Sequence, residues 1–181
     1  MPSGLSEFAE VAIPVAVHGS FGTKMPTLGQ ERYKDPFFFH LVCHPWEMQG
    51  ACLDVVCGGV LSKFPGLKVA FLESGIGWVP WFMARLDGDF KKMPQDEGLK
   101  TGLPSDYLRG GNCFFACDPD EATLPYVASV MGEDTIIYAS DYPHWDARYP
   151  NSVRLLAQRD DLTAGLKRKI LCDNGRRLYN L

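Results

Sequence analysis

The chain has 181 residues, of which 46% are hydrophobic and 22% are charged, and its net charge is −4. This composition is typical of a globular protein, and the length allows about one domain with a buried core. The absence of a lysine- and arginine-rich run argues against nucleic acid as a partner. Because there is no long apolar run and no signal-peptide pattern in the opening MPSGLSEFAE, we expect a cytoplasmic protein without a membrane partner.

Four apolar runs predict β-strands, at residues 11–17, 67–73, 112–117 and 135–140. Their apolar character is continuous rather than alternating, which is typical of parallel strands covered on both faces. Amphipathic helical patterns separate or follow them, at 46–64, 77–93, 119–132 and 163–181. Strand and helix alternate four times, so the sequence predicts an α/β fold with right-handed crossovers.

One connection is unusually long. Residues 19–39 form a loop rich in glycine and proline after the first strand, and a loop of that length in a small domain is usually functional or disordered. Its place after a strand favours a function. His40 and His44 follow it, at the expected start of the next helix, where they either cap and pack or contact a substrate.

The six cysteines form no Cys-x-x-Cys pair, and most of them have apolar neighbours, as in ACLDVVCGGV. Buried free thiols in a reducing cytosol explain this pattern better than disulfides or a zinc site.

Polar side chains lie where the predicted strands end: His18, Glu73, Asp118 and Asp141. In parallel α/β proteins these ends meet on one side, where such folds bind ligands. Asp118 precedes a proline, and we interpret it as a cap of the next helix. For the other three residues, a metal or acid–base site and structural capping are equally good readings. Imidazole and carboxylate ligands suit zinc, manganese or iron.

Two stretches, GGVLSKFPGLKVAFLESGIGWVPWFMARLD and YASDYPHWD, resemble the amidohydrolase-related metal-dependent hydrolases, a family that includes aminocarboxymuconate-semialdehyde decarboxylase. KILCDNGRRLYNL is similar to the closing helix of the family. The resemblance implies a (β/α)₈ barrel with a metal on its C-terminal rim. The four predicted strands match strands five to eight only, and the family's His-x-His is absent. Residues 1–181 are thus expected to be a partial barrel domain, the C-terminal half of a TIM-type barrel.

The resemblance also implies roles for individual residues. It makes His18 a metal ligand and Asp141 a ligand and proton carrier, while Glu73 binds metal, orients water or contacts substrate. His144 is a candidate catalytic helper, although an exposed loop histidine is an equal reading. The expected metal is a divalent ion, zinc first and manganese or iron as alternatives. Apart from the resemblance, Trp78 and Trp145 follow strand ends and either pack in the core or rim or, with His44, are candidate substrate-binding residues.

Two functions follow from this resemblance. The first is a metal-dependent hydrolase or non-oxidative decarboxylase acting on a small organic acid and represented here by a partial chain. The second is a non-catalytic half-barrel, a remnant or interaction module without a working metal site. A half-barrel would leave open strand edges and bare inward-facing side chains. We therefore expect pairing with a second copy or with a missing N-terminal half, or else poor stability.

Overall fold

A four-stranded parallel sheet forms the centre of the structure, a computed structural model that describes residues 12–19, 27–93, 98–99 and 101–181. Its strands lie in sequence order and each neighbouring pair runs parallel, so β1 and β4 are the two edges of this sheet. The predicted α/β fold with a parallel sheet is confirmed. The strands are β1 (Val15–Val17), β2 (Val69–Phe71), β3 (Cys113–Cys117) and β4 (Ile136–Tyr138).

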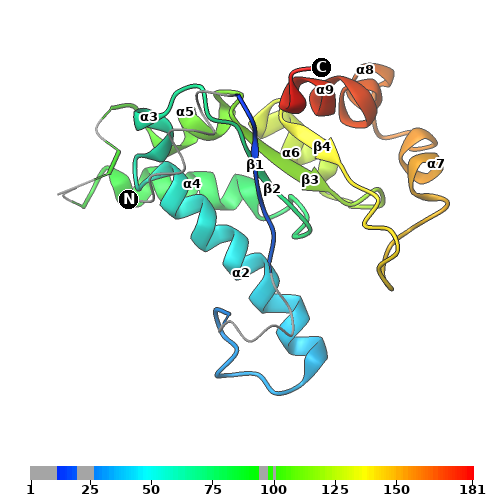
Figure 1. Cartoon of the computed structure of the whole chain (residues 1–181), viewed down its shortest axis with the longest axis horizontal. Helices are drawn as coiled ribbons and strands as arrows, with labels where there is room; N and C mark the ends of the chain where they lie inside the picture. The colour runs from blue at the N-terminus through cyan, green and yellow to red at the C-terminus, as the bar shows by residue number, and fades with distance from the viewer. Residues whose placement is uncertain (1–11, 20–26, 94–97, 100) are drawn as a thin grey trace.

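Helices follow every strand. The first cross-connection contains α2 and α3, the second α4 and α5, and the third α6, and a group of short helices closes the chain. In Figure 1, α4 lies next to α5 and α6, and the closing helices lie beside β4. The helices are α2 (Pro36–Val56), α3 (Val60–Lys63), α4 (Val79–Phe90), α5 (Pro104–Arg109), α6 (Leu124–Met131), α7 (Ser152–Ala157), α8 (Ala164–Arg168), the π-helical turn η1 (Lys169–Asp173) and α9 (Asn174–Tyr179).

Helix α2 begins ten residues earlier than predicted. Asp35 is its N-cap and accepts a hydrogen bond from the backbone N–H of Phe37 at 2.8 Å, while Pro36 occupies the first turn, where a proline is favourable. The end of the predicted 19–39 loop is therefore helical, and its residues 20–26 lie outside the described residues. His40 and His44 are the fifth and ninth residues of α2, so neither caps the helix, and the first turns of α2 extend beyond the sheet (Figure 1).

The helix predicted at 119–132 begins only at Leu124, with Thr123 as its N-cap residue. The chain first makes a turn in which the N–H of Glu121 donates to the carbonyl of Asp118 at 3.3 Å. The prediction that Asp118 caps this helix is therefore wrong. The turn separates Asp118 from the helix and leaves its side chain at the carboxyl end of β3.

The strands bury side chains on both faces, as their continuous apolar sequence predicts. Phe71 and Phe115 stack at 5.1 Å in the larger cluster, which the helices α4 and α6 cover. On the other face, Ala70, Phe114, Ala116 and Ile137 are at most 6% exposed and pack around Leu178 of α9. These four side chains of β2, β3 and β4 are not bare, contrary to the expectation for a half-barrel, because α9 covers them, whereas Ala16 of β1 is exposed. No helix in the described part of the chain is long and apolar enough to cross a membrane.

Candidate metal centre

The carboxyl ends of the strands, together with α2, enclose a cleft of about 1050 Å³. All four histidines of the chain line it. The remaining charged lining residues are five carboxylates and one guanidinium, so the described part of the cleft is strongly acidic. Such a concentration of like charge favours a bound cation. These charged residues are Glu73, Asp118, Asp120, Asp141, Asp146 and Arg148.

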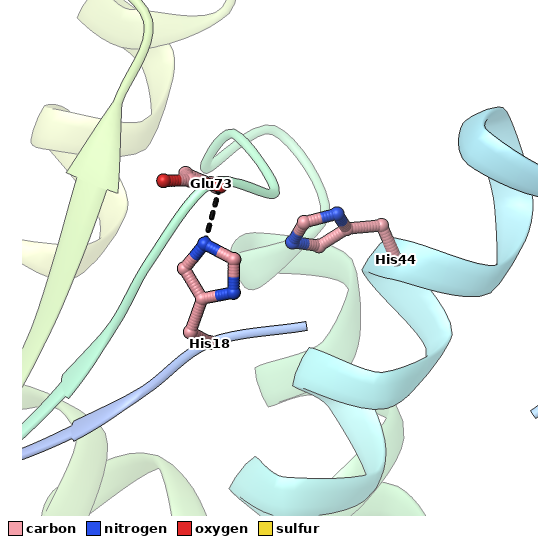
Figure 2. A group of neighbouring side chains, drawn as sticks. All are labelled: His18, His44 and Glu73. Carbon is pink, nitrogen blue, oxygen red and sulfur yellow. Dashed lines mark ion pairs between the residues drawn. The ribbon is translucent and has the colours of Figure 1, made fainter. Parts of the chain in front are cut away.

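A first cluster of ligand-type side chains brings together His18, Glu73 and His44. His18 follows β1, Glu73 follows β2, and His44 reaches them from α2, as Figure 2 shows. The Nε2 atom of His18 lies 2.6 Å from Oε2 of Glu73, and the rings of His18 and His44 are 5.6 Å apart. One ligand atom from each residue lies within 4.8 Å of the others, a spacing from which a divalent ion could be held.

His44 is the residue of this cluster that most clearly lacks a partner. Its Nε2 is buried without a hydrogen bond among the described residues, a rare and costly state for a ring nitrogen. Burial lowers the pKa of His44, and the nearby His18 and His40 lower it further. The imidazole is therefore neutral near pH 7, and neutral imidazole is the form that binds metals.

Gly19 allows this approach of α2 to the sheet. A Cβ atom at position 19 would lie 2.5 Å from Cδ2 and 2.6 Å from Nε2 of His44, closer than side chains pack. The residue after His18 must therefore be a glycine if His44 is to keep its place.

Glu73 and Asp141 both have left-handed backbone conformations, with φ of 55° and 53°. Residues other than glycine adopt this conformation at a cost of about 1 kcal/mol or more, and such strain is concentrated at functional sites. Burial raises the pKa of Glu73, and its hydrogen bond with Asp141 raises the pKa further. This contact joins the first cluster to the loop after β4.

A second cluster, on that loop, consists of Asp141, His144 and Asp146. Nδ1 of His144 lies 2.6 Å from Oδ1 of Asp146 and 3.6 Å from Oδ2 of Asp141. The hydrogen bond with Asp146 raises the pKa of His144, which favours the protonated ring. Nε2 of His40 also approaches Oδ2 of Asp146, at 3.5 Å. Asp146 thus links two histidines, a role that the sequence pattern did not reveal.

The structure brings most of the predicted site residues together. His18, Glu73, Asp141, His144 and His44 all line the cleft. Trp145 does too; it is 77% exposed, and its ring lies near those of His40 and His144, tilted against both. Trp78 lies elsewhere: its ring packs against Phe82 and Phe115, and its N–H donates to the carbonyl of Gly75.

Asp118, which was assigned to capping, also lines the cleft. Burial by the surrounding loops raises its pKa, and the carboxylates of Glu121 and Asp120 raise it further. No functional role was predicted for three of the cleft carboxylates, Asp118, Asp120 and Asp146.

The amino-acid sequence matches a family model described as Amidohydrolase over residues 4–181. Among curated proteins, 2-amino-3-carboxymuconate-6-semialdehyde decarboxylase of Dictyostelium discoideum is 28% identical over 117 residues, which are 64% of this chain and 32% of that protein. The 6-methylsalicylic acid decarboxylase of Penicillium expansum is 24% identical over 104 residues, 56% of this chain and 31% of that protein. The aligned part of the chain thus corresponds to about a third of the length of each of these two relatives.

Solved structures show the same fold. An amidohydrolase of Mycobacterium avium subsp. paratuberculosis matches with a TM-score of 0.79 and 26% identity over 98% of this chain and 44% of its own. The 5-carboxyvanillate decarboxylase of Sphingomonas paucimobilis has a TM-score of 0.79 and 18% identity over 98% of this chain and 52% of its own. A dihydroxybenzoic acid decarboxylase of a Polaromonas species, with bound manganese, has a TM-score of 0.74 and 16% identity. The match covers 100% of this chain and 55% of that protein.

Proposed function

Because the chain belongs to the amidohydrolase family, we propose that its cleft binds a divalent metal ion and catalyses the non-oxidative decarboxylation of a small organic acid. The observation that carries this proposal is the first cluster, in which Nε2 of His44 is buried without a partner beside the His18–Glu73 pair. A side chain that served packing alone would not bury an unpaired ring nitrogen in a cleft lined by five carboxylates.

The residues present fit a divalent ion. His18, Glu73 and Asp141 are the proposed ligands, and His44 joins them because its nitrogen lies within 4.8 Å of the ligand atoms of His18 and Glu73. Imidazole and carboxylate donors suit zinc, iron and manganese. One solved relative named as a decarboxylase has bound manganese, which makes manganese the ion to test first, and zinc follows because it also suits imidazole and carboxylate donors.

When bound, the ion would supply positive charge that stabilises negative charge developing on the substrate. The substrate loses its carboxylate as carbon dioxide when the carbon–carbon bond breaks, and the carbon left behind takes one proton. Two residues of the cleft can carry that proton. Asp141 shares a hydrogen bond with Glu73, and His144 is held through Nδ1 by Asp146, which leaves its second ring nitrogen for the substrate.

Aromatic side chains at the mouth of the cleft favour a flat substrate. Trp145 and Phe37 are 77% and 67% exposed, and both line the cleft. Exposed rings beside charged groups are suited to stack on a conjugated acid. We propose a substrate-binding role for Trp145, with a small conjugated or aromatic carboxylic acid as the substrate class.

We also propose that the fold is the second half of a (β/α)₈ barrel and that further protein completes the cleft. The solved relatives are longer, since the chain spans 44% and 52% of two of them, and β1 and β4 are open edges of the described sheet. A second copy of the chain, or a preceding segment with the remaining strands, would cover these edges. Light scattering on the purified chain distinguishes a dimer from a monomer.

The test of the proposed function measures metal binding and carbon dioxide release in the same preparation. The chain should bind about one equivalent of Mn²⁺ or Zn²⁺ by calorimetry and release carbon dioxide from a hydroxybenzoate-type acid. His44→Ala should weaken metal binding about tenfold or more, whereas Glu133→Gln, a carboxylate paired with Lys169 at the opposite end of the sheet, should not. A chain that binds neither ion would instead support the non-catalytic interaction module.

A further inference from the structure

The loop that carries Glu73 is held from outside the cleft by one carboxylate, that of Glu121. The backbone N–H groups of Ile76 and Gly77 both point at this carboxylate: Ile76 donates at 3.0 Å and 3.1 Å to its two oxygens, and Gly77 donates to Oε1 at 2.6 Å. Two successive N–H groups converging on an anion form a nest, a strong backbone site for negative charge. The partners are 44 and 45 residues apart in sequence, so the contact joins two separate loops of the rim.

The same carboxylate also lies next to the start of α4. Ile76 and Gly77 precede Val79, the first residue of that helix, and helix amino ends carry partial positive charge. The contact is close because Gly77 lacks a side chain: a Cβ there would lie 2.8 Å from Oγ1 of Thr123 and 3.2 Å from Oε1 of Glu121. Thr123 itself donates to Glu121 at 3.0 Å.

The backbone of the turn that carries Glu121 is in turn bound by the side chain of Arg159. Arg159, only 12% exposed, donates to the carbonyls of Glu121 at 2.7 Å and Pro119 at 3.3 Å. Its orientation is set by an ion pair with Asp161, at 2.9 Å and 2.6 Å. The turn that carries Glu121 is therefore rigid, and a rigid turn can impose a conformation on the loop that it binds.

That conformation is the strained one of the first cluster. Glu73 has a left-handed backbone and is followed two residues later by Gly75, also left-handed, with φ of 61°. Glycine adopts this conformation without strain, whereas the left-handed backbone of Glu73 costs free energy and needs bonds from its surroundings to hold it. The bonds from Glu121 begin at the next residue, Ile76.

From this geometry we infer that Glu121 is a positioning residue for the metal centre: it holds the 73–77 loop so that Glu73 meets His18 and His44. The inference rests on the proposed function, because it assigns Glu121 a purpose through the metal ligands. Glu121 does not itself touch the ion or the substrate. Neighbours that orient metal ligands change metal affinity by about 10- to 100-fold when they are removed.

Three variants test the contact between Glu121 and the 73–77 loop, two by changing the carboxylate and one by changing the glycine that it approaches. Glu121→Gln keeps one acceptor oxygen but loses the charge and the second acceptor, and should weaken Mn²⁺ binding about threefold to tenfold. Gly77→Ala keeps the carboxylate but places a Cβ against it, and should weaken binding to a similar degree. Glu121→Ala should have the largest effect, about tenfold or more, and the other two variants keep the test decisive if this one does not fold.

The matched control is Asn174→Ala, which removes hydrogen bonds at the opposite end of the sheet. It should lower the melting temperature without changing the Mn²⁺ dissociation constant measured by calorimetry on the folded chain. Binding by Glu121→Gln and Gly77→Ala within twofold of the wild type would overturn the inference while leaving the proposed function standing. A wild-type chain that binds no Mn²⁺ or Zn²⁺ would overturn the proposed function, and the inference with it.

Discussion

The carboxyl ends of the strands and the amino ends of the same strands differ in how their polar side chains are paired. At the carboxyl ends, Nε2 of His44 is buried without a partner among the described residues. Two carboxyl groups, Glu73 and Asp141, share a hydrogen bond there, and both residues have strained backbones.

At the amino ends, by contrast, side chains bond to backbone carbonyls. Asn174 donates to the carbonyls of Glu133 and Ile136, each at 2.7 Å, and the ammonium group of Lys68 binds the carbonyl of Arg177. Thr135, whose hydroxyl is buried without a partner, is an exception at this end. The amino ends thus favour stability, whereas the carboxyl ends keep an unpaired ring nitrogen and several carboxylates together, an arrangement suited to a bound cation.

The largest effect is expected from Asp141→Asn. The substitution removes a proposed ligand and proton carrier, so carbon dioxide release by the metal-loaded protein should fall by about 10³-fold. The measurement is initial-rate kinetics with the circular-dichroism spectrum as a check of folding. Asp134→Asn, at the amino end beside Lys169, is the control and should keep wild-type rates. Turnover of Asp141→Asn within tenfold of wild type would contradict the assigned role.

The next effect should appear at the opposite end. Asn174→Ala removes the donor to the partly buried carbonyl of Glu133 and to the buried carbonyl of Ile136, which should cost about 3 kcal/mol of unfolding free energy. In a protein of this size the melting temperature should fall by roughly 10 °C. Denaturant titration measures the loss, and an unchanged midpoint would show that these hydrogen bonds contribute nothing net.

A smaller effect is expected from Gly19→Ala. The new methyl group would meet His44, so metal affinity should fall about tenfold while the melting temperature changes little. Gly88→Ala is the matched control, because a Cβ at that helical position meets nothing within 4 Å and should slightly stabilise α4. Equal metal affinity in the two glycine variants would argue against His44 as a ligand.

The smallest effect concerns the thiols. Burial raises the pKa of Cys113 and of Cys117 to about 12, so at pH 8 both remain protonated and unreactive. Cys172 is exposed, and iodoacetamide should label it in the native chain while leaving the two strand cysteines unmodified. Mass spectrometry of tryptic peptides reads the result. Their reactivity should rise only as pH approaches 12 or when the chain unfolds, and fast labelling of Cys113 at pH 8 would show that β3 is open.

The sequence predicted the sheet well, because four continuous apolar runs leave few alternatives to a parallel α/β arrangement. The predicted start of α2 is wrong, since the helix begins at Pro36 and includes Pro45. The expected cysteine environment is confirmed for Cys43, Cys52, Cys113 and Cys117, which are buried and free.

Only the site residues that closely follow strands could be predicted from the sequence. His18, Glu73 and Asp141 follow strands, so a sequence pattern could indicate them. Glu121 could not be found in this way, because its role depends on N–H groups 44 and 45 residues away. His44 was predicted to cap and pack or to contact a substrate, and not to bind metal, since its distance from His18 depends on how α2 crosses the rim.

Helix α2 carries His40 and His44 one turn apart, and its first turns extend beyond the sheet (Figure 1). An ion bound by His44 together with His18 after β1 and Glu73 after β2 would link the projecting end of α2 to the sheet. Because Met48, Cys52 and Val56 in the second half of α2 are buried in the core, the ion would hold only the first turns of the helix against the rim.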